Sequence, residues 1–342
     1  MKYLQIFLLF FIITTFAFCS KKDSGPDLGS APTNLMVNAV VSTDNSGNVS
    51  FTASATNAIS YDFDFGNGAF KTLPGGVVTY KYATSGTYTV NITARSSTDL
   101  TLTKSIAVTV SVAVSLAWSE EFDSPGAPDP LKWSYDLGNN NGWGNSELEY
   151  YTNRLNNASV SNGTLKITAV KESYQGYNYT SARLVTNNKF SFKYGKIEVR
   201  AKLPSGLGVW PAIWMLGSNF ATNPWPSCGE IDIMEQKGSA PDKIYSTLHH
   251  PNHFGANGNG SSTTITNATS EFHRYAAEWN ASNIKFSVDD VEFYTFANNN
   301  TLPFNNNFFI ILNLAMGGNF TGNVDPNLNS AVFEVDYVRV YQ

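Results

Sequence analysis

The sequence predicts an all-β protein made of two β-sandwich domains. Aromatic residues and charged residues each make up 14% of the 342 residues, and Asn, Ser, Thr and Gly are abundant, which is typical of exported β-proteins. Polar and apolar residues alternate in short runs between Gly- and Asn-rich segments, and no segment has convincing amphipathic-helix periodicity. The formal net charge of -5 and the lack of a basic cluster indicate that nucleic acid is not a partner.

The first residues predict export. An apolar run, Leu4–Phe18, ends directly at Cys19 and is too short for a stable transmembrane helix. A Cys at this place resembles the lipidation site of a bacterial lipoprotein, so residues 1–19 are predicted to be a lipoprotein-type signal and Cys19 the lipidated residue. The protein would then sit on the outer membrane or cell surface and touch the membrane only through its lipid. An ordinary signal peptide and a secreted protein are the alternative.

A small β-sandwich is predicted after the signal. Residues 20–30 form a polar, flexible linker, and strands at hairpin spacing follow over residues 31–112. Two segments, 61–68 and 80–90, resemble a PKD-type immunoglobulin-like domain, with Asn67 in place of the usual Asp. No chemistry is visible in this module, so we expect a spacer, with sugar contact as the alternative.

The larger domain is predicted over residues 114–342. Strands with polar and apolar alternation follow one another along it, at 165–170, 195–201, 308–312 and 333–341. A domain of this size built from strands alone is expected to consist of two large packed sheets.

Three carboxylates crowd one of these strands. Glu230, Asp232 and Glu235 lie within six residues of an otherwise apolar run. Strands avoid Asp and Glu, and a buried carboxylate is costly unless it is paired or functional. Side-chain alternation puts Glu230 and Asp232 on one face and Glu235 on the other. A β-bulge at Ile233–Met234 would return Glu235 to the face of the other two, and bulges favour active sites.

Paired carboxyl groups are what the cleavage of a glycosidic bond requires. One must be ionised and the other protonated, and a separation of about 5–5.5 Å makes one the nucleophile, whereas a wider gap admits a water. Positions two apart on a strand are separated by about 6.6 Å, so spacing alone leaves both outcomes open. Asp232 would couple to both glutamates and keep their pKa values apart. A hard-metal site is the alternative explanation of the three acids.

The segment 229–235 closely resembles the active-site signature of glycoside hydrolase family 16, in the form with one extra residue before the last Glu. That bulged form occurs in the family's laminarinases, agarases and carrageenases, whereas bacterial lichenases lack the insertion. The resemblance extends over the whole large domain, through the segments 142–152, 194–200, 208–216, 272–279, 312–318 and 335–340.

This resemblance implies the catalytic roles and the fold. Glu230 would be the nucleophile, Glu235 the general acid/base and Asp232 their assistant, in a retaining double displacement that needs no cofactor. The domain would be a β-jelly-roll, a two-sheet concanavalin-like sandwich.

The resemblance also implies sugar-binding residues. Trp210 and Trp214 correspond to positions that stack on sugar rings, although both could instead face the core. Asn145, Glu147 and Arg183 would hydrogen-bond to hydroxyl groups.

Two further sites follow from the same resemblance. His249, on the strand expected next to the acids, would support the site. Some family members carry a structural calcium away from the cleft, and Glu121, the Gly163 carbonyl and Asp336 resemble its ligands.

The expected substrate is a polysaccharide, β-1,3-glucan of the laminarin type. The segments 142–152 and 312–318 resemble the endo-1,3-β-glucanase branch, and there is little sign of the Arg- and Lys-lined cleft that a sulfated galactan would need. We expect a monomer. Mixed-linkage glucan is an additional candidate substrate. An agarase-type galactanase of the same family and a non-catalytic glycan-binding lipoprotein are the alternatives.

Overall fold

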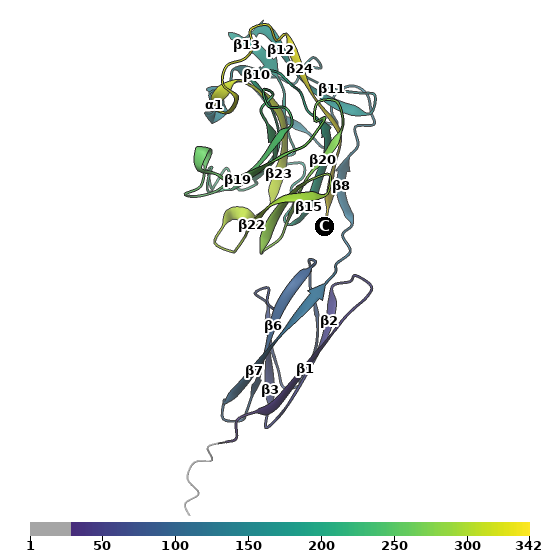
Figure 1. Ribbon diagram of the computed structural model, residues 1–342, viewed down its shortest axis with the longest axis vertical. Coiled ribbons are helices and arrows are strands. Elements are labelled where there is room, and N and C mark those ends of the chain that lie inside the picture. Colours follow the sequence, from purple (N-terminus) through teal and green to yellow (C-terminus); the bar gives the residue numbers. More distant parts are fainter. Residues whose placement is uncertain (1–28) are drawn as a thin grey trace, which may run out of the picture. The chain divides into compact units, whose positions relative to one another are not determined.

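The structure, a computed structural model, describes residues 29–342 (Figure 1). The predicted signal with Cys19 and nearly all of the predicted linker lie outside the described residues. Within the described range, every helix is too short or too polar to cross a bilayer. Among residues 29–342, strands dominate and the longest α-helix, α1 (Gly318–Thr321), has 4 residues, so the all-β prediction is confirmed.

The chain divides into two compact units. The first ends with residues Thr87–Val110, and the second contains everything from Ser111 to Gln342 together with the short segments Thr43–Gly47 and Tyr82–Gly86. The predicted domain boundary, between residues 112 and 114, falls between the last strand of the first unit and the first strand of the second.

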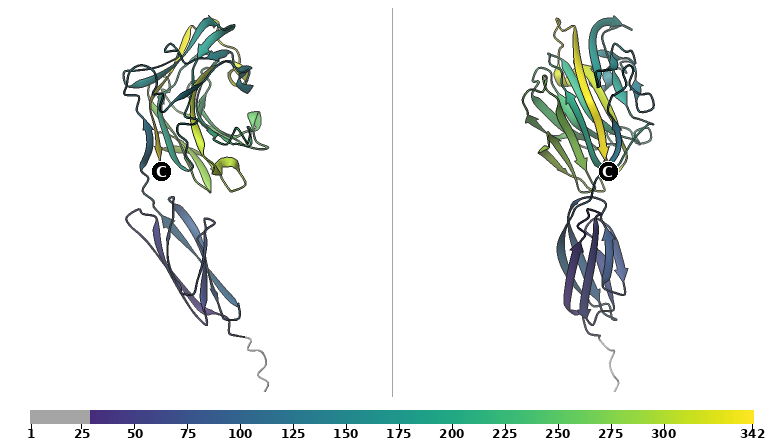
Figure 2. Two further views of the ribbon diagram at one scale, coloured as in Figure 1. Left: turned by 180° about the vertical axis from the view of Figure 1, so that it is seen from behind. Right: turned by 90° about the vertical axis from the view of Figure 1, so that its right-hand side faces the viewer.

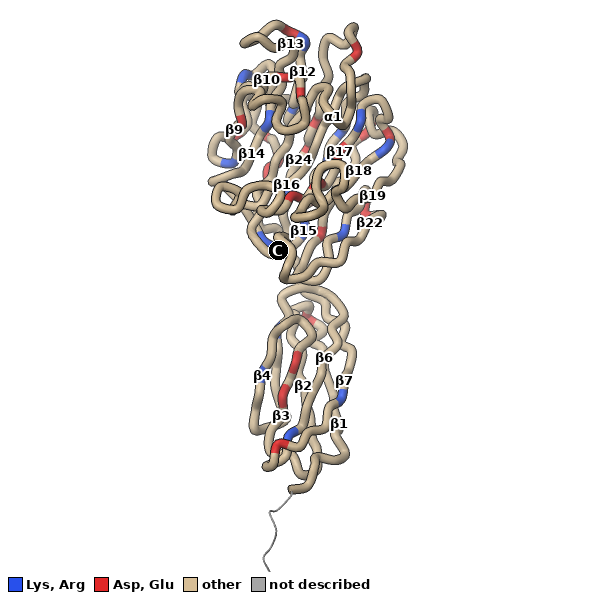
Figure 3. The backbone as a smooth tube through the Cα atoms, turned by 90° about the vertical axis from the view of Figure 1, so that its left-hand side faces the viewer, with Lys and Arg blue, Asp and Glu red and all other residues tan. Residues whose placement is uncertain are grey.

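The first unit is a small sandwich with an aromatic core. One sheet has the strand order β1-β2-β5 and the other β4-β3-β6-β7. Phe51, Phe63 and Phe65 are fully buried between the sheets, with ring centroids 5.7–6.3 Å apart. The acidic positions of β3 are red in Figure 3, and one of them, Asp62, pairs with Arg95 at 2.5 Å. The strands are β1 (Thr33–Val41), β2 (Asn48–Thr56), β3 (Ser60–Asp64), β4 (Phe70–Leu73), β5 (Val77–Lys81), β6 (Gly86–Arg95) and β7 (Thr101–Val110).

The second unit consists of two large sheets. The ten-stranded sheet has the order β10-β13-β12-β24-β15-β20-β21-β22, with β11 paired to β12 and β8 to β24. Its longest strand, β24, is the yellow strand near its middle in Figure 2. The strands of this sheet are β8 (Leu116–Glu120), β10 (Glu149–Tyr151), β11 (Ala158–Ser161), β12 (Thr164–Tyr174), β13 (Tyr177–Ser181), β15 (Gly195–Lys202), β20 (His273–Trp279), β21 (Asn283–Val288), β22 (Val291–Ala297) and β24 (Ser330–Tyr341).

The seven-stranded sheet has the order β19-β18-β17-β16-β23-β14-β9 and carries the candidate site. Neighbouring strands of this sheet are antiparallel throughout. Its strands are β9 (Ser134–Asp136), β14 (Arg183–Val185), β16 (Val209–Gly217), β17 (Glu230–Gln236), β18 (Lys243–His249), β19 (Asn259–Thr264) and β23 (Phe308–Met316). The connections contain the short 3-10 helices η1 (Gly142–Gly144), η2 (Gly255–Asn257) and η3 (Pro303–Asn305).

The core of the second unit lies between its two sheets. Alternate residues of each strand point inward, as period-2 sequences require. Trp279 and Phe286 of the ten-stranded sheet and Phe308 of the seven-stranded sheet belong to this core and are at most 1% exposed. All nine residues of β23 are buried, because the other face of this central strand is covered by the residues that line a cleft. That cleft opens on the free face of the seven-stranded sheet.

Candidate active site

The predicted bulge lies in β17, at the predicted place. Against β16, Met234 pairs with Ile213 and Asp232 with Trp214, so Ile233 has no partner. The register against β18 shifts over the same residues, between Asp232 and Glu235. Two consecutive side chains, Ile233 and Met234, therefore both enter the core. Beyond the bulge, the alternation of inward and outward side chains resumes one residue late. The predicted bulge at Ile233–Met234 is confirmed.

The bulge brings the three acids to one surface. Glu230, Asp232 and Glu235 all line a cleft of about 1030 Å³ over the seven-stranded sheet. Asp232 is the most enclosed of the three, with 3% of its surface exposed, whereas Glu230 and Glu235 are partly exposed. Ile231, which lies between two of the acids, points into the core instead. Three carboxyl groups thus share the floor of one cleft.

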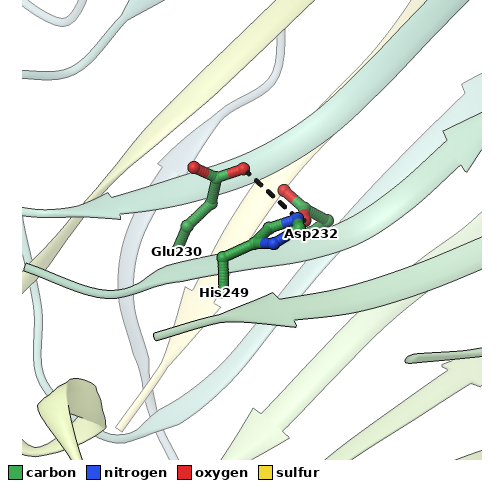
Figure 4. Close-up of side chains that lie close together, drawn as sticks. All are labelled: Glu230, Asp232 and His249. Carbon is green, nitrogen blue, oxygen red and sulfur yellow. Dashed lines mark ion pairs between the residues drawn. The ribbon is translucent and has the colours of Figure 1, made fainter. Parts of the chain in front are cut away.

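His249 lies beside two of the acids (Figure 4). It ends β18, and the strand register puts it opposite Glu230. Its Nε2 is 3.1 Å from Oδ2 of Asp232 and 3.9 Å from Oε1 of Glu230. The imidazole therefore contacts the nucleophile candidate and the central Asp, at the position that the sequence singled out for a supporting residue.

Glu235 is held by two donors from neighbouring strands. Trp210 of β16 donates its Nε1–H to Oε1 of Glu235 at 3.1 Å, and Thr247 of β18 donates its hydroxyl to Oε2 at 3.4 Å. Trp210 is only 8% exposed, and its ring packs against Phe320 of α1 with centroids 4.9 Å apart. Trp210 lines the cleft as predicted, but its indole also orients a carboxyl group, which the sequence did not indicate.

Burial raises the pKa of all three carboxyl groups, and repulsion between them adds to the effect. The pKa of Glu235 rises to about 7 and that of Glu230 to about 8, and the pKa of Asp232 lies well above its usual range. His249 and Arg183 act in the opposite direction on the pKa of Glu230, because positive charge favours the ionised carboxylate. Groups that interact so closely titrate as a set, so the cluster keeps protons near neutral pH.

Arg183 organises the adjacent wall. Its guanidinium lies between two indole rings, 4.5 Å from the centroid of Trp143 and 4.7 Å from that of Trp214. Its Nε is 2.9 Å from Oδ2 of Asp136 on β9. We call Trp143, Arg183 and Trp214 the Trp-Arg-Trp stack. Trp214 is half-buried and lines the cleft, so the predicted alternative that it belongs to the core is wrong.

The other predicted sugar-binding residues line the cleft as well. Asn145 and Glu147 follow η1 and are joined by a hydrogen bond of 3.1 Å from Nδ2 of Asn145 to Oε1 of Glu147. Asn145 is half-buried, and Glu147 is 7% exposed.

Sequence reasoning missed three aromatic lining residues. Trp225 is 45% exposed, in the loop before β17, and its ring lies 6.1 Å from His249. Tyr245 and Phe320 form the opposite margin, with centroids 5.5 Å apart. A Trp in the loop directly before the acid-bearing strand was a usable signal. Nothing local marks Phe320, whose place depends on how α1 folds over the sheet.

The hard-metal alternative is not favoured by this geometry. Among residues 29–342, one group of at least three His, Cys, Asp or Glu side chains brings its ligand atoms together, namely Glu230, Asp232 and His249. Calcium and magnesium prefer oxygen ligands, and one of the three groups here is an imidazole nitrogen.

The predicted calcium ligands lie at adjoining strand ends of the ten-stranded sheet. Pairing of β12 with β24 ends at Val335, and pairing of β8 begins at Val338, so Asp336 lies beside the adjoining ends that carry Gly163 and Glu121. Hard oxygen donors suit calcium. The two carboxylates, however, already pair with arginine, Glu121 with Arg339 and Asp336 with Arg200. Calcium here stays a prediction.

Comparison with protein families identifies the large domain. Residues 145–339 match the model described as "Glycosyl hydrolases family 16", and residues 30–112 match that of a PKD domain. The chain belongs to glycosyl hydrolase family 16. It is therefore a glycoside hydrolase, and both predicted family memberships are confirmed.

Individual relatives support the same placement. A beta-glucanase from Rhodothermus marinus is 47% identical over 243 residues, which cover 66% of this chain and 85% of that protein. The crystal structure of the laminarinase from Rhodothermus marinus superposes with a TM-score of 0.64 at 45% identity and covers 67% of this chain and 98% of that chain. LamA from Z. galactanivorans, solved with laminaritriose and laminaritetraose, superposes with a TM-score of 0.62 at 45% identity and covers 66% and 98%. These similarities confirm the jelly-roll prediction.

Proposed function

We propose that this family 16 glycoside hydrolase cleaves internal bonds of β-1,3-glucan by a retaining double displacement. The observation that carries the proposal is the bulged strand β17, which presents Glu230, Asp232 and Glu235 together on the floor of an open cleft. The similar proteins include a beta-glucanase and laminarinases, one of them solved with laminarin-type oligosaccharides. The site is a cleft with a volume of about 1030 Å³ and not a closed pocket, and such a shape suits cleavage within a chain.

In the first step, the ionised Glu230 attacks the anomeric carbon. A Glu230 oxygen–carbon bond forms while the glycosidic carbon–oxygen bond breaks. Glu235 transfers its proton to the departing sugar oxygen, so no charged leaving group is released. A pKa raised to about 7 keeps Glu235 protonated at slightly acid pH, as a general acid requires.

In the second step, a water molecule attacks the same carbon. Glu235, now ionised, accepts a proton from this water, and the bond to Glu230 breaks. The product keeps the β configuration because two inversions cancel. Glu235 regains its proton and Glu230 its negative charge, so the site is restored for the next turn.

Asp232, His249 and Arg183 act together on the charge of Glu230. Asp232 is the most enclosed acid, and its own charge would raise the pKa of Glu230, so Glu230 can be ionised only while Asp232 is protonated. His249 contacts both groups, and Arg183 favours the ionised form of Glu230 from the next wall. The mechanism requires Glu230 to carry the negative charge although burial and Asp232 raise its pKa to about 8, so the opposing action of His249 and Arg183 is what the nucleophile depends on.

The lining of the cleft favours a neutral polysaccharide. Arg183 is the one Lys or Arg side chain among the described residues that line it, and Asp136 already balances its charge. A sulfated galactan would need unpaired cations to bind its ester groups. The aromatic rings of Trp143, Trp214 and Trp225 instead offer flat surfaces for the apolar faces of sugar rings.

Hydrolysis of laminarin, lichenan, agarose and carrageenan by the purified protein tests the proposal. We expect short glucose oligomers from laminarin and slower release from the mixed-linkage lichenan. Products only from agarose or carrageenan would support the galactanase alternative. Sugar binding without turnover on any substrate would support a binding protein. Proton NMR of the first products should show the β-anomer, and an α-anomer would overturn the role given to Glu230.

We also propose that the protein is exported and carries lipid on Cys19. The support is the sequence alone, namely an apolar run that ends at this Cys. In a bacterial host fed labelled palmitate, the full chain should become labelled and fractionate with the outer membrane. Cys19→Ser should abolish the label, and labelling that survives this change would contradict the proposal.

A further inference from the structure

A second carboxyl pair lies behind the cleft wall. Glu149 of β10 is fully buried, and its Oε2 accepts the backbone N–H of Met316 at 2.7 Å. Its Oε1 is buried and receives no N–H or O–H donor, and Glu147, two residues earlier in the chain, is the carboxyl group that acts on it. Glu147 is 7% exposed and reaches the cleft. The catalytic steps use neither group.

The pair is connected to the Trp-Arg-Trp stack by hydrogen bonds. Tyr151 donates its hydroxyl to Oε2 of Glu147 at 3.0 Å and accepts Nδ2–H of Asn313 at 3.0 Å. Asn313 Oδ1 accepts Nε1–H of Trp214 at 2.8 Å. Asn313 lies on β23 directly opposite Arg183 on β14. An unbroken series of contacts therefore links the buried pair to the indole that lines the cleft.

Two adjacent buried carboxyl groups cannot both carry charge at low cost. Burial and the neighbouring Glu147 raise the pKa of Glu149 well above its usual range. Within the pair, a protonated Glu149 would be the donor and Glu147 the acceptor. Glu147 would then accept three hydrogen bonds, from Asn145, Tyr151 and Glu149.

The other charged groups around Glu149 leave the pair intact. Tyr151, on the same strand, stays neutral because burial and the two glutamates raise its pKa. Arg183 of β14 is the nearby cation, and it is paired with Asp136 of β9. Tyr179 of β13 lies opposite Glu149 in the strand register. The packed strand β23, FFIILNLAM, contains no titratable side chain. Among residues 29–342, the nearby cation is therefore already paired and does not neutralise a second carboxylate.

We propose that Glu149 is a positioning residue for the sugar-binding wall: its buried carboxylic acid donates to Glu147 and thereby fixes the Tyr151, Asn313 and Trp214 contacts. This inference rests on the proposed function, because it assigns the wall to sugar binding. Loss of the proton would place two negative charges side by side and push Glu147 away from Tyr151. Substrate binding, rather than the chemical step, would weaken.

The variant Glu149→Gln tests this proposal with laminarin as substrate. The amide Nε2 can donate to Glu147, and the amide oxygen can accept the Met316 N–H, but neither group titrates. The wild-type KM should rise about tenfold between about pH 6 and about pH 9, equivalent to about 1.4 kcal/mol, while the KM of the variant stays nearly constant. The alkaline fall of kcat should persist in both, because it belongs to the other cluster. Glu271→Gln, an exposed carboxyl, is the matched control and should behave as wild type.

Two measurements decide the proposal without substrate. A carboxyl whose pKa is raised by folding loses stability as pH rises from about 4.3 through the folded pKa, so the Tm of Glu149→Gln should increasingly exceed that of wild type over this range. The other acids contribute equally to both proteins. Near-ultraviolet circular dichroism of the tryptophans should change more at alkaline pH in the wild type than in the variant, because only the wild type loses the proton of Glu149.

The outcomes are separable from those of the proposed function. A wild type that does not hydrolyse laminarin contradicts the proposed function, while the Tm and dichroism comparisons still decide the role of Glu149. If the Tm and the circular dichroism of wild type and variant depend on pH in the same way, the role proposed for Glu149 is overturned. Failure of Glu149→Gln to fold also overturns it, since the amide reproduces each hydrogen bond of the carboxylic acid.

Discussion

Two clusters of carboxyl groups, one lining the cleft and one extending behind its wall, differ in their surroundings. Glu230, Asp232 and Glu235 line the cleft floor beside His249, whereas Glu147 and Glu149 are enclosed by amides, a phenol and backbone N–H groups. Burial and repulsion raise pKa values in both. Only the first cluster has an imidazole beside it and open access for a substrate. A raised pKa therefore shows only that a carboxyl group is enclosed. Whether its proton can serve in catalysis depends on the access of substrate to the group and on neighbouring cations.

The largest expected effect is at the nucleophile. Glu230→Ser should lower kcat on laminarin by roughly a thousandfold or more, because no other group in the cluster is placed to form the covalent bond. Assays of purified variants with reducing-sugar detection measure this loss. Glu271→Gln should retain activity. Substantial turnover by Glu230→Ser would contradict the role of nucleophile given to Glu230. The first cluster would then be no more reactive than the second.

A smaller effect is expected at the donor to the acid. Trp210→Phe removes the N–H bonded to Glu235, which stabilises its ionised form. The pKa of Glu235 should rise, the alkaline limb of kcat should move to higher pH, and kcat should fall about tenfold. The pH profile of kcat on laminarin is the measurement. Trp118→Phe, outside the cleft lining, is the control, and an unmoved limb in Trp210→Phe would contradict the assignment of Glu235.

The second cluster should respond in binding and stability instead. Tyr151→Phe leaves the buried Nδ2 of Asn313 without its acceptor and Glu147 without one donor. We expect about 1–3 kcal/mol less unfolding free energy and a higher KM, with kcat little changed. Urea unfolding and steady-state kinetics measure the two effects. Tyr275→Phe is a matched control, because the Tyr275 hydroxyl is buried without a partner and its loss should cost little. A fall confined to kcat would contradict the separation of the clusters.

The smallest effect concerns the predicted calcium, which lies away from both clusters. Chelation with EDTA should lower Tm by about 2–4 °C, if the ion contributes about 1 kcal/mol, and leave the pH dependence of kcat and KM unchanged. Calorimetry with and without added calcium measures the shift. An unchanged Tm would contradict the predicted site at Glu121, Gly163 and Asp336. If chelation changed the pH dependence of kcat or KM, the pKa values of the two clusters would not be set by their local surroundings alone.

The pattern that exposed the first cluster also exists in the second. Glu147 and Glu149 alternate around Leu148 at the start of a strand, as Glu230 and Asp232 do around Ile231. Sequence reasoning assigned Glu147 to sugar binding and passed over Glu149. The alternation was a usable signal for an acid pair. Which member faces the cleft, and which is enclosed behind it, depends on packing against β23, which lies far away in the sequence.

The sequence by itself determined the strands, the bulge and the three acids on one face. These features follow from side-chain alternation and from one extra residue, which are local properties of the chain. Only the tertiary structure decided the partners of those acids. The contacts of His249 with Asp232, of Trp210 with Glu235 and of Arg183 with Trp214 join different strands, and Arg183 also contacts Trp143 of η1. Strand order and register set these contacts, and both arise from packing between residues distant in sequence.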